Sequence, residues 1–173
     1  MNLALYTFGQ FIKPADHPAN DDFHTLNDQI LELMHEVPGF IARSGYASDP
    51  GPVSWGEEVY PEFYVERGDE WSPATLSLWE NLEAPFAFTY FGLHATALKR
   101  GREWFQKPNW PPLVLWWHTN ESVPTWREGV SRHKRLHDHG PTCDAFTFKQ
   151  AFNQNGTTVK LDKAYAQTLA NRT

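Results

Sequence analysis

His94 is the residue whose type and position best suit acid–base chemistry. A set of residues between 87 and 105 recurs at alternating spacings of four and three, which predicts one helical stripe. The stripe consists of Ala87, Phe91, His94, Leu98, Gly101 and Phe105. On an apolar stripe, an imidazole can act as a general acid or base, or donate to a substrate oxygen, because its ordinary pKa is near neutrality. The competing interpretation is a histidine satisfied within the core, and both interpretations stay open.

Tyr6 and Arg43 are two further hydrogen-bond donors, and each lies in a segment that predicts a β-strand. Either side chain could donate to a carbonyl or carboxylate group of a substrate. Arg43 could equally pair with Glu80 or Glu83 across the sheet. We predict His94, Tyr6 and Arg43 as the catalytic residues of one cleft.

The segment PLVLWWHT, residues 112–119, carries two adjacent tryptophans and a histidine. Alternation along a strand places Trp117 on one face with Leu113 and Leu115, and it places Trp116 and His118 on the other. In one interpretation both tryptophans belong to a core or an interface. In the other, one tryptophan forms the wall of a pocket and His118 lies at its rim.

Aromatic residues supply the predicted walls of this pocket. The predicted substrate-binding residues are Trp71, Trp79, Tyr90, Phe91, Trp116, Trp117 and His118. Trp71 belongs to the segment 48–74, which has four prolines, three glycines and no clear period. Long segments without regular structure are often functional, and the aromatic content of this one is unlike that of a disordered chain. We therefore predict that part of 55–71 acts as a lid.

No motif in the sequence indicates a cofactor or a metal. His133 and His137 have the spacing of a zinc pair, but the glutamate of the metalloprotease motif is missing. Histidines at a helix end, where the helix dipole favours positive charge, are the better interpretation. Cys143 is the single cysteine, which excludes an internal disulfide and a cysteine-rich zinc site. Glycine-rich nucleotide motifs are also missing, so we predict no cofactor and no metal.

Alternating strands and helices are predicted to position these residues. Strands are expected at 3–11, 40–47, 75–80, 113–119 and 145–152, and helices near 21–37, 81–105 and 125–139. Gly92 should break the second helix, and Thr125 with Glu128 forms a capping box that begins the third. The order β-α-β-β-α-β-α-β predicts an α+β fold whose first six elements are those of a ferredoxin-like unit. One domain covers 1–152, and a polar tail covers 153–173.

The overall composition fits one folded domain with a large aromatic core or a roomy apolar site. The chain has 173 residues, of which 15% are aromatic, and a formal net charge of −6. The negative charge disfavours binding to nucleic acid or to an anionic membrane. We expect a cytoplasmic protein, because the sequence lacks a signal-peptide pattern and a long apolar run.

The assembled motifs resemble a known family. The residues that carry the resemblance are LSLWENLEAPFAFTYFGLHATALKRGREWF, PLVLWWHT and PTWREGVSRHKRLHDHGPTCDAFTF. They are similar to an uncharacterised bacterial and fungal family of domains of unknown function, placed in the dimeric α+β barrel superfamily. The resemblance covers residues 2–152, although the segment 48–74 is longer and more aromatic than we expect of the family.

This resemblance implies a ferredoxin-like monomer with its helices on one face of the sheet. Two such sheets would pair face to face, so it also implies a homodimer. Members of the superfamily include cofactor-free monooxygenases, polyketide cyclases, dehydratases, isomerases and haem-binding proteins. The fold does not choose among these activities.

The function expected from the sequence is a cofactor-independent enzyme acting on an apolar small molecule, such as a specialised metabolite. A cyclase or isomerase fits, because a cyclisation, pericyclic or proton-transfer step needs shape and few titratable groups. Two alternatives stay open. One is a cofactor-free monooxygenase, and the other is a non-catalytic protein that binds haem or a hydrophobic ligand.

Overall fold

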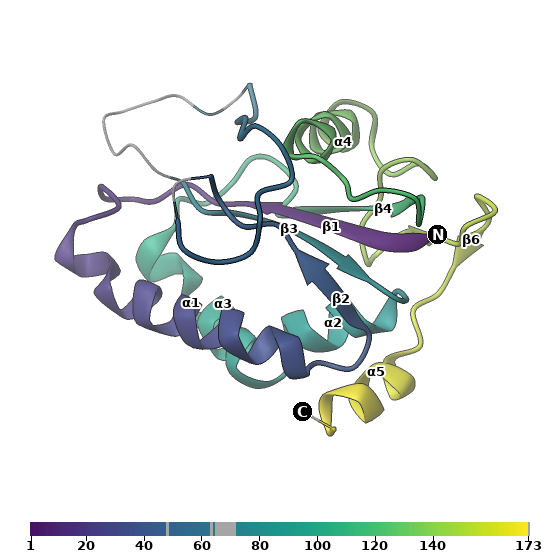
Figure 1. The fold of residues 1–173 in the computed structure, drawn as a ribbon, viewed down its shortest axis with the longest axis horizontal. Coiled ribbons are helices and arrows are strands. Elements are labelled where there is room, and N and C mark those ends of the chain that lie inside the picture. The colour runs from purple at the N-terminus through teal and green to yellow at the C-terminus, as the bar shows by residue number, and fades with distance from the viewer. Residues whose placement is uncertain (48, 63, 65–71, 173) are drawn as a thin grey trace.

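The computed structural model describes residues 1–47, 49–62, 64 and 72–172, and it has an α+β architecture (Figure 1). The strands are β1 (Asn2–Phe8), β2 (Phe40–Arg43), β3 (Ala74–Trp79), β4 (Leu113–His118), β5 (Ala151–Phe152) and β6 (Thr158–Val159). The α-helices are α1 (Asp21–Leu33), α2 (Glu83–Tyr90), α3 (Gly92–Trp104), α4 (Trp126–His139) and α5 (Lys163–Ala170). Short 3-10 helices lie at Pro18–Asn20 and Met34–Glu36.

A four-stranded antiparallel sheet in the order β2-β3-β1-β4 forms the centre of the molecule. β1 is an inner strand, with Leu5 opposite Ser77 on β3 and Leu115 on β4. Its neighbour Tyr6 is opposite Leu76 and Val114. Because side chains alternate along a strand, Leu5 and Tyr6 point to opposite faces of the sheet.

Both faces of the sheet are buried. Leu3, Leu5 and Leu115 pack on the face that is covered by residues of α1, α2 and α5. Tyr6, Val114 and Trp116 pack on the other face. A strand that is buried on both faces has no need of polar alternation, which explains the continuous apolar run of β4.

The prediction that all helices lie on one face of the sheet is wrong. α4 lies on the face opposite α1, α2 and α3 (Figure 1), where Trp126 and Leu136 pack with Tyr6. Trp126 is 2% exposed, so this packing buries a large aromatic side chain. In a dimeric barrel this face would meet the sheet of a partner, but here it is packed against α4 and against Tyr46, Trp55, Val59 and Tyr64.

The prediction of a fifth strand at 145–152 is also wrong. Phe146 forms a single antiparallel bridge with Leu115, and the backbone then turns. Only Ala151 and Phe152 form a strand, and they pair with Thr158–Val159 in a separate two-stranded sheet. Phe146 is fully buried, although the segment 145–152 forms no continuous ladder with β4.

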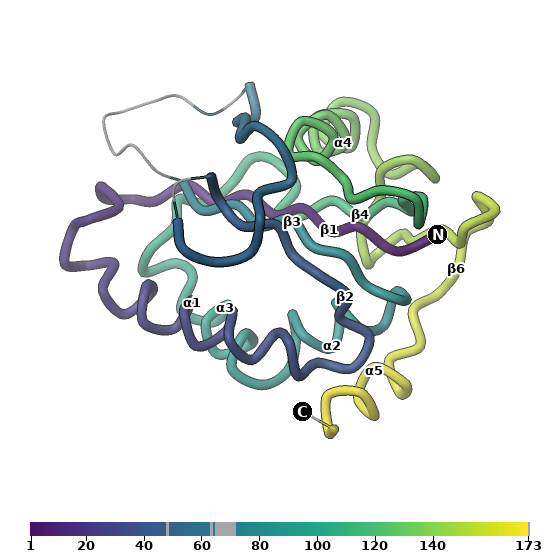
Figure 2. Tube along the Cα trace, in the orientation of Figure 1, coloured from purple at the N-terminus to yellow at the C-terminus, as the bar shows by residue number. Residues whose placement is uncertain are grey.

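The C-terminal segment, predicted as a polar tail, contributes to the core. Figure 2 follows the chain from α4 past the N-terminus to α5, and Gln154 Nε2 donates to Met1 O over 3.2 Å on the way. Ala166 and Leu169 of α5 are 0% and 3% exposed and pack on the face that α2 covers. In the part of the chain that the structure describes, none of the helices has the length and apolarity to cross a membrane.

Candidate functional site

A small apolar cavity lies beside His94, where α1, the junction of α2 and α3, and the end of α5 meet. Its volume is about 70 Å³. The lining residues are Ile30, Leu33, Val37, Ala87, Phe88, Phe91, Gly92, Leu93, His94 and Ala170. His94 is the only titratable group among them, so the wall can contact apolar groups and offers one position for proton transfer.

The break between α2 and α3 positions His94 at the cavity. α2 ends at Tyr90, and Gly92 at φ +59° allows the chain to start α3 in a new direction. This conformation is in the left-handed region, which glycine adopts without a steric cost. His94 then lies in the first turn of α3, with its ring centroid 5.0 Å from that of Phe88.

The tautomer of His94 is fixed by a backbone contact. Its Nδ1 lies 3.1 Å from the carbonyl oxygen of Thr89, which can only accept, so Nδ1 carries the proton. Nε2, the other ring nitrogen, is left with a lone pair. Burial lowers the pKa of His94, which keeps the ring neutral near pH 7. The geometry therefore provides a neutral base at the cavity.

Phe91 is the other predicted site residue that lines the cavity. Trp79 lies one layer behind the wall, with its ring 5.5 Å from Phe88 and its Nε1 donating to Ser77 Oγ over 2.8 Å. Tyr90 lies outside the lining and is 44% exposed. Its pKa is raised by partial burial.

Trp117 faces the same side of the sheet as the cavity but has a structural contact. Its Nε1 donates to the carbonyl oxygen of Phe152 over 2.7 Å. This bond ties β5 to the edge strand β4. Trp117 is not among the residues that line the cavity.

Tyr6 and Trp116 lie on the opposite face of the sheet from His94, so the predicted cleft does not bring them together. Both side chains are fully buried, and neither Tyr6 Oη nor Trp116 Nε1 has a hydrogen-bond partner among the described residues. The Tyr6 ring packs edge-on to Trp126 and His133, at centroid distances of 6.3 and 5.6 Å. Burial raises the pKa of Tyr6 far above its ordinary range, so it stays protonated.

Arg43, His118 and Trp71 are also separate from the cavity. Arg43 Nη1 donates to the carbonyl oxygen of Ser44 over 3.4 Å, and within the described residues no ion pair joins it to Glu80 or Glu83. His118 ends β4 and belongs to a polar network with α4. Trp71 and the predicted lid residues 65–70 lie outside the described residues.

Sequence reasoning missed the part of the cavity wall that α1 and α5 supply. Ile30, Leu33 and Val37 have helical spacing, which predicts an apolar face of the first helix. That spacing does not reveal which other helix the face contacts. Ala170 lies in the segment that was predicted as a polar tail, so the sequence did not place it at the cavity.

The residues of the cavity do not form a metal site. No group of three or more histidine, cysteine, aspartate or glutamate side chains in the described ranges is arranged to hold a metal ion. His133 and His137 differ in their surroundings, since His133 is fully buried with its Nε2 2.6 Å from Pro111 O, whereas His137 is exposed beside Asp138. Burial lowers the pKa of His133.

Comparison with family models finds one match, and it spans almost the whole chain. Residues 2–162 match the model described as Domain of unknown function (DUF3291). Comparison with curated proteins and with solved structures finds no match. The matched range includes every residue that lines the cavity except Ala170 of α5. The chain therefore belongs to the DUF3291 family of domains of unknown function.

Proposed function

We propose that the protein is a cofactor-independent enzyme that moves a proton on an apolar small molecule, with His94 as the general base and acid. The observation that carries this proposal is a neutral imidazole, held by Nδ1 on Thr89 O, in the wall of an otherwise apolar cavity. A specialised metabolite with a weakly acidic C–H or O–H group is the substrate class that suits such a wall.

In the proposed reaction, Nε2 removes a proton from the substrate while Nδ1 keeps its proton on the Thr89 carbonyl. The imidazolium that forms is disfavoured by its apolar surroundings, so it returns the proton to a different atom of the substrate. The net result is an isomerisation, and a cyclisation follows if the electron pair closes a ring in between. Atoms and charge balance without a cofactor or an oxidant.

The size of the cavity limits what can enter. A volume of about 70 Å³ holds a few heavy atoms, whereas sites for drug-sized ligands measure about 300–1,000 Å³. The substrate would therefore insert one apolar end beside His94. The rest of a larger ligand would remain outside the cavity, where Ala170 of α5 is one of the lining residues.

We also infer a ferredoxin-like arrangement of the sheet. The strand order β2-β3-β1-β4 with antiparallel neighbours supports it, as do the crossovers through α1 and through α2 and α3. A homodimer stays a prediction. Pairing of two sheets through the face of Tyr6 would require α4 and the side chains of Tyr46, Trp55, Val59 and Tyr64 to leave that face.

The test separates binding from catalysis. The purified protein is incubated with an extract of hydrophobic metabolites, and products are followed by liquid chromatography with mass spectrometry. We expect isomeric products with wild type and none with His94→Gln, whose amide can still donate to Thr89 O. Tyr90→Phe is the control, because Tyr90 is adjacent in sequence but outside the cavity lining. Equal conversion by wild type and His94→Gln would refute the role of His94.

Ligand binding has its own readout. Ala87→Leu fills the cavity and should weaken retention of any ligand found by native mass spectrometry, whereas His94→Gln should retain it. Added haem is a further probe of the same site. A Soret band that disappears in His94→Gln would replace the proposed enzyme by a haem-binding protein.

A further inference from the structure

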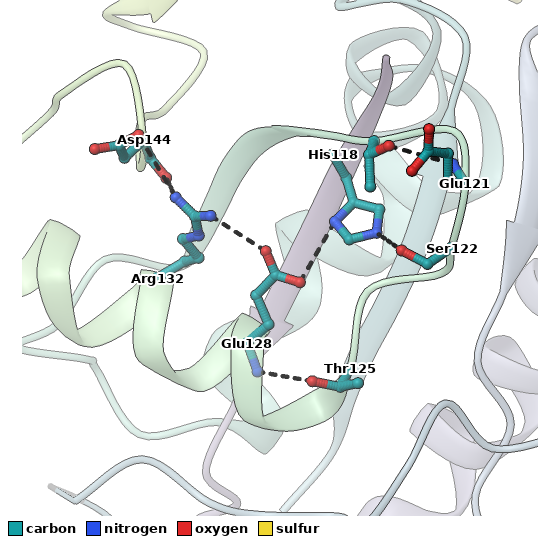
Figure 3. A network of polar contacts seen from close by, with 8 residues as sticks. His118, Glu121, Ser122, Thr125, Glu128, Arg132 and Asp144 are labelled. Carbon is teal, nitrogen blue, oxygen red and sulfur yellow. Dashed lines mark hydrogen bonds and ion pairs between the residues drawn. The ribbon is translucent and has the colours of Figure 1, made fainter.

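A serine, a histidine and a glutamate form a continuous series of polar contacts at the start of α4, one a hydrogen bond and the other an ion pair (Figure 3). His118 Nε2 lies 3.1 Å from Ser122 Oγ, and His118 Nδ1 lies 3.4 Å from Glu128 Oε2. The two ring nitrogens thus contact a hydroxyl on one side and a carboxylate on the other. This is the connectivity by which a carboxylate orients an imidazole that activates a serine nucleophile.

The end of β4 and the N-terminus of α4 bring the three residues together. His118 is the last residue of β4, and the chain turns through 119–125 before α4 begins. Thr125 caps α4, with its Oγ1 accepting from Glu128 N over 3.2 Å. The cap fixes the backbone of Glu128 one turn into the helix, on the side that faces His118.

The Glu128 carboxylate is directed away from the capping role that the sequence predicts. Among the described residues it accepts no hydrogen bond from the Thr125 N–H. Its Oε1 instead pairs with Arg132 Nη2 over 3.2 Å, and Arg132 Nη1 donates to the carbonyl oxygen of Asp144 over 2.9 Å. Arg132 therefore holds one carboxylate oxygen while the other faces the imidazole, as an orienting acid requires.

Ser122 is the most accessible member of the series, since it is exposed, whereas the side chains of His118 and Glu128 are 10% and 27% exposed. An open groove of about 600 Å³ runs along α4 beside the network, and Thr125, Glu128, Arg132 and Asp144 are among its lining residues. His118 and Ser122 are not among them, so only the glutamate end of the series borders the groove. The groove is polar, unlike the cavity beside His94, so it would hold a polar molecule.

We propose that Ser122, His118 and Glu128 form a second catalytic site, which hydrolyses carboxylic esters of polar small molecules. Ser122 Oγ bonds to the ester carbonyl carbon, and its proton passes to His118 Nε2. The C–O bond to the alcohol breaks, and the alcohol leaves with that proton. Water then attacks the acyl-serine with His118 as base, which releases the carboxylic acid and restores Ser122.

This site is independent of the function proposed for His94. His94 lies in α3 on one side of the sheet, whereas the series joins β4 to α4 on the other. The cavity beside His94 has an apolar lining, whereas the groove along α4 has a polar one. A failure of one proposal therefore leaves the other untouched.

A fluorophosphonate probe tests the proposal directly, because it phosphonylates activated serines with loss of fluoride. Peptide mapping by mass spectrometry should locate the adduct on Ser122 in wild type, and Ser122→Ala should abolish it. Ser131 is the internal control, since it is an exposed serine of α4 that lines the groove and has no histidine partner in the described structure. Labelling of Ser122 no faster than that of Ser131 would overturn the proposal.

Two conservative variants test the roles of the histidine and the glutamate. His118→Gln should slow labelling of Ser122 by at least about a hundredfold, and Glu128→Gln by at least about tenfold. Circular dichroism checks that each variant is folded, and hydrolysis of p-nitrophenyl acetate provides a second readout. Unchanged labelling in a folded His118→Gln variant would also refute the proposal.

Discussion

The chemistry of His94 depends on burial and on one backbone carbonyl. Thr89 O takes the proton of Nδ1, and apolar neighbours keep the ring neutral. Tyr6, by contrast, is buried without a hydrogen-bond partner for its hydroxyl in the described residues, and it contacts only rings of the opposite face. At this scale a residue's surroundings, more than its type, decide whether it can react.

The pH dependence of stability should reveal the burial of His94. Because the pKa of His94 is lowered in the folded state, the unfolded chain binds a proton first as the pH falls. The free energy of unfolding should therefore decrease as the pH falls below the unfolded value of about 6.5. His94→Gln removes this contribution, so urea unfolding from about pH 7.5 to 5.5 should show a smaller loss.

His133 should also lower the free energy of unfolding as the pH falls, because burial lowers its pKa as well. Part of the pH dependence should therefore remain in His94→Gln. Leu93→Gln is the matched control, since it places the same side chain at the cavity and removes no titrating group. Equal pH dependence in wild type and His94→Gln would contradict the prediction.

Two fully buried tryptophans should respond differently to the same substitution. Trp79 Nε1 donates to Ser77 Oγ over 2.8 Å, whereas Trp116 Nε1 has no partner in the described structure. Both changes to phenylalanine leave a cavity, but only Trp79→Phe loses a hydrogen bond and leaves a buried hydroxyl unpaired. Trp79→Phe should cost at least about 1 kcal/mol more in the free energy of unfolding. Equal costs in urea unfolding would show that Trp116 has a partner as well.

The elements that matter most for the proposed function are the two helices that meet at Gly92. Without the break, Ala87 and His94 would lie on one continuous stripe with Leu98. In the structure Leu98 is 48% exposed, and only the part near the break faces the cavity. α4 is equally important for the second site, because its capped first turn places Glu128 beside His118.

Alanine at two glycines of this region should have effects of opposite sign. An added Cβ meets no atom within 4 Å at either Gly92 or Gly101, so crowding contributes to neither variant. Gly92→Ala forces alanine to φ +59° and should destabilise the protein by about 1–2 kcal/mol. Gly101→Ala lies inside α3 and should stabilise it by up to about 1 kcal/mol. Thermal unfolding of both variants provides the comparison, and stabilisation by Gly92→Ala would contradict the predicted helix break.

For the whole molecule, the position of α4 on the second face of the sheet is the feature that departs most from the dimeric barrel implied by the resemblance. α4 approaches β1 closely where Gly129 lies over the ring of Tyr6. This approach allows the chain to cover the face itself, without a second copy.

Gly129→Ala tests that packing. A Cβ at this position would lie 3.0 Å from Tyr6 Cδ2, so the ring or the helix must give by a few tenths of an ångström. The Tyr6 ring is fully buried against Trp126 and His133, so we expect overpacking to cost about 1–3 kcal/mol, against a gain of up to about 1 kcal/mol from helix propensity. We expect net destabilisation in urea unfolding. An increase in stability like that of Gly101→Ala would show that the Tyr6 ring yields to the added methyl group.

The sequence by itself determined the local elements. Strands of four or more residues occur in four of the predicted segments because β-formers and buried alternation persist there, and Thr125 and Gly140 begin and end α4 as predicted. The break at Gly92 was also predicted from one residue type. The strand predicted at 145–152 forms only at Ala151–Phe152, because Phe146 pairs with Leu115 through a single bridge and not through a ladder.

Only the tertiary structure decided which residues meet. Alternation correctly placed Trp116 and Trp117 on opposite faces of the sheet, yet it could not predict which helices cover each face. The cavity that His94 lines together with α1 and α5, and the contacts of His118 with Ser122 and Glu128, depend on how distant segments pack. Local periodicity specifies the face of an element but not its neighbour, because the neighbour is chosen by the complementarity of all buried surfaces together.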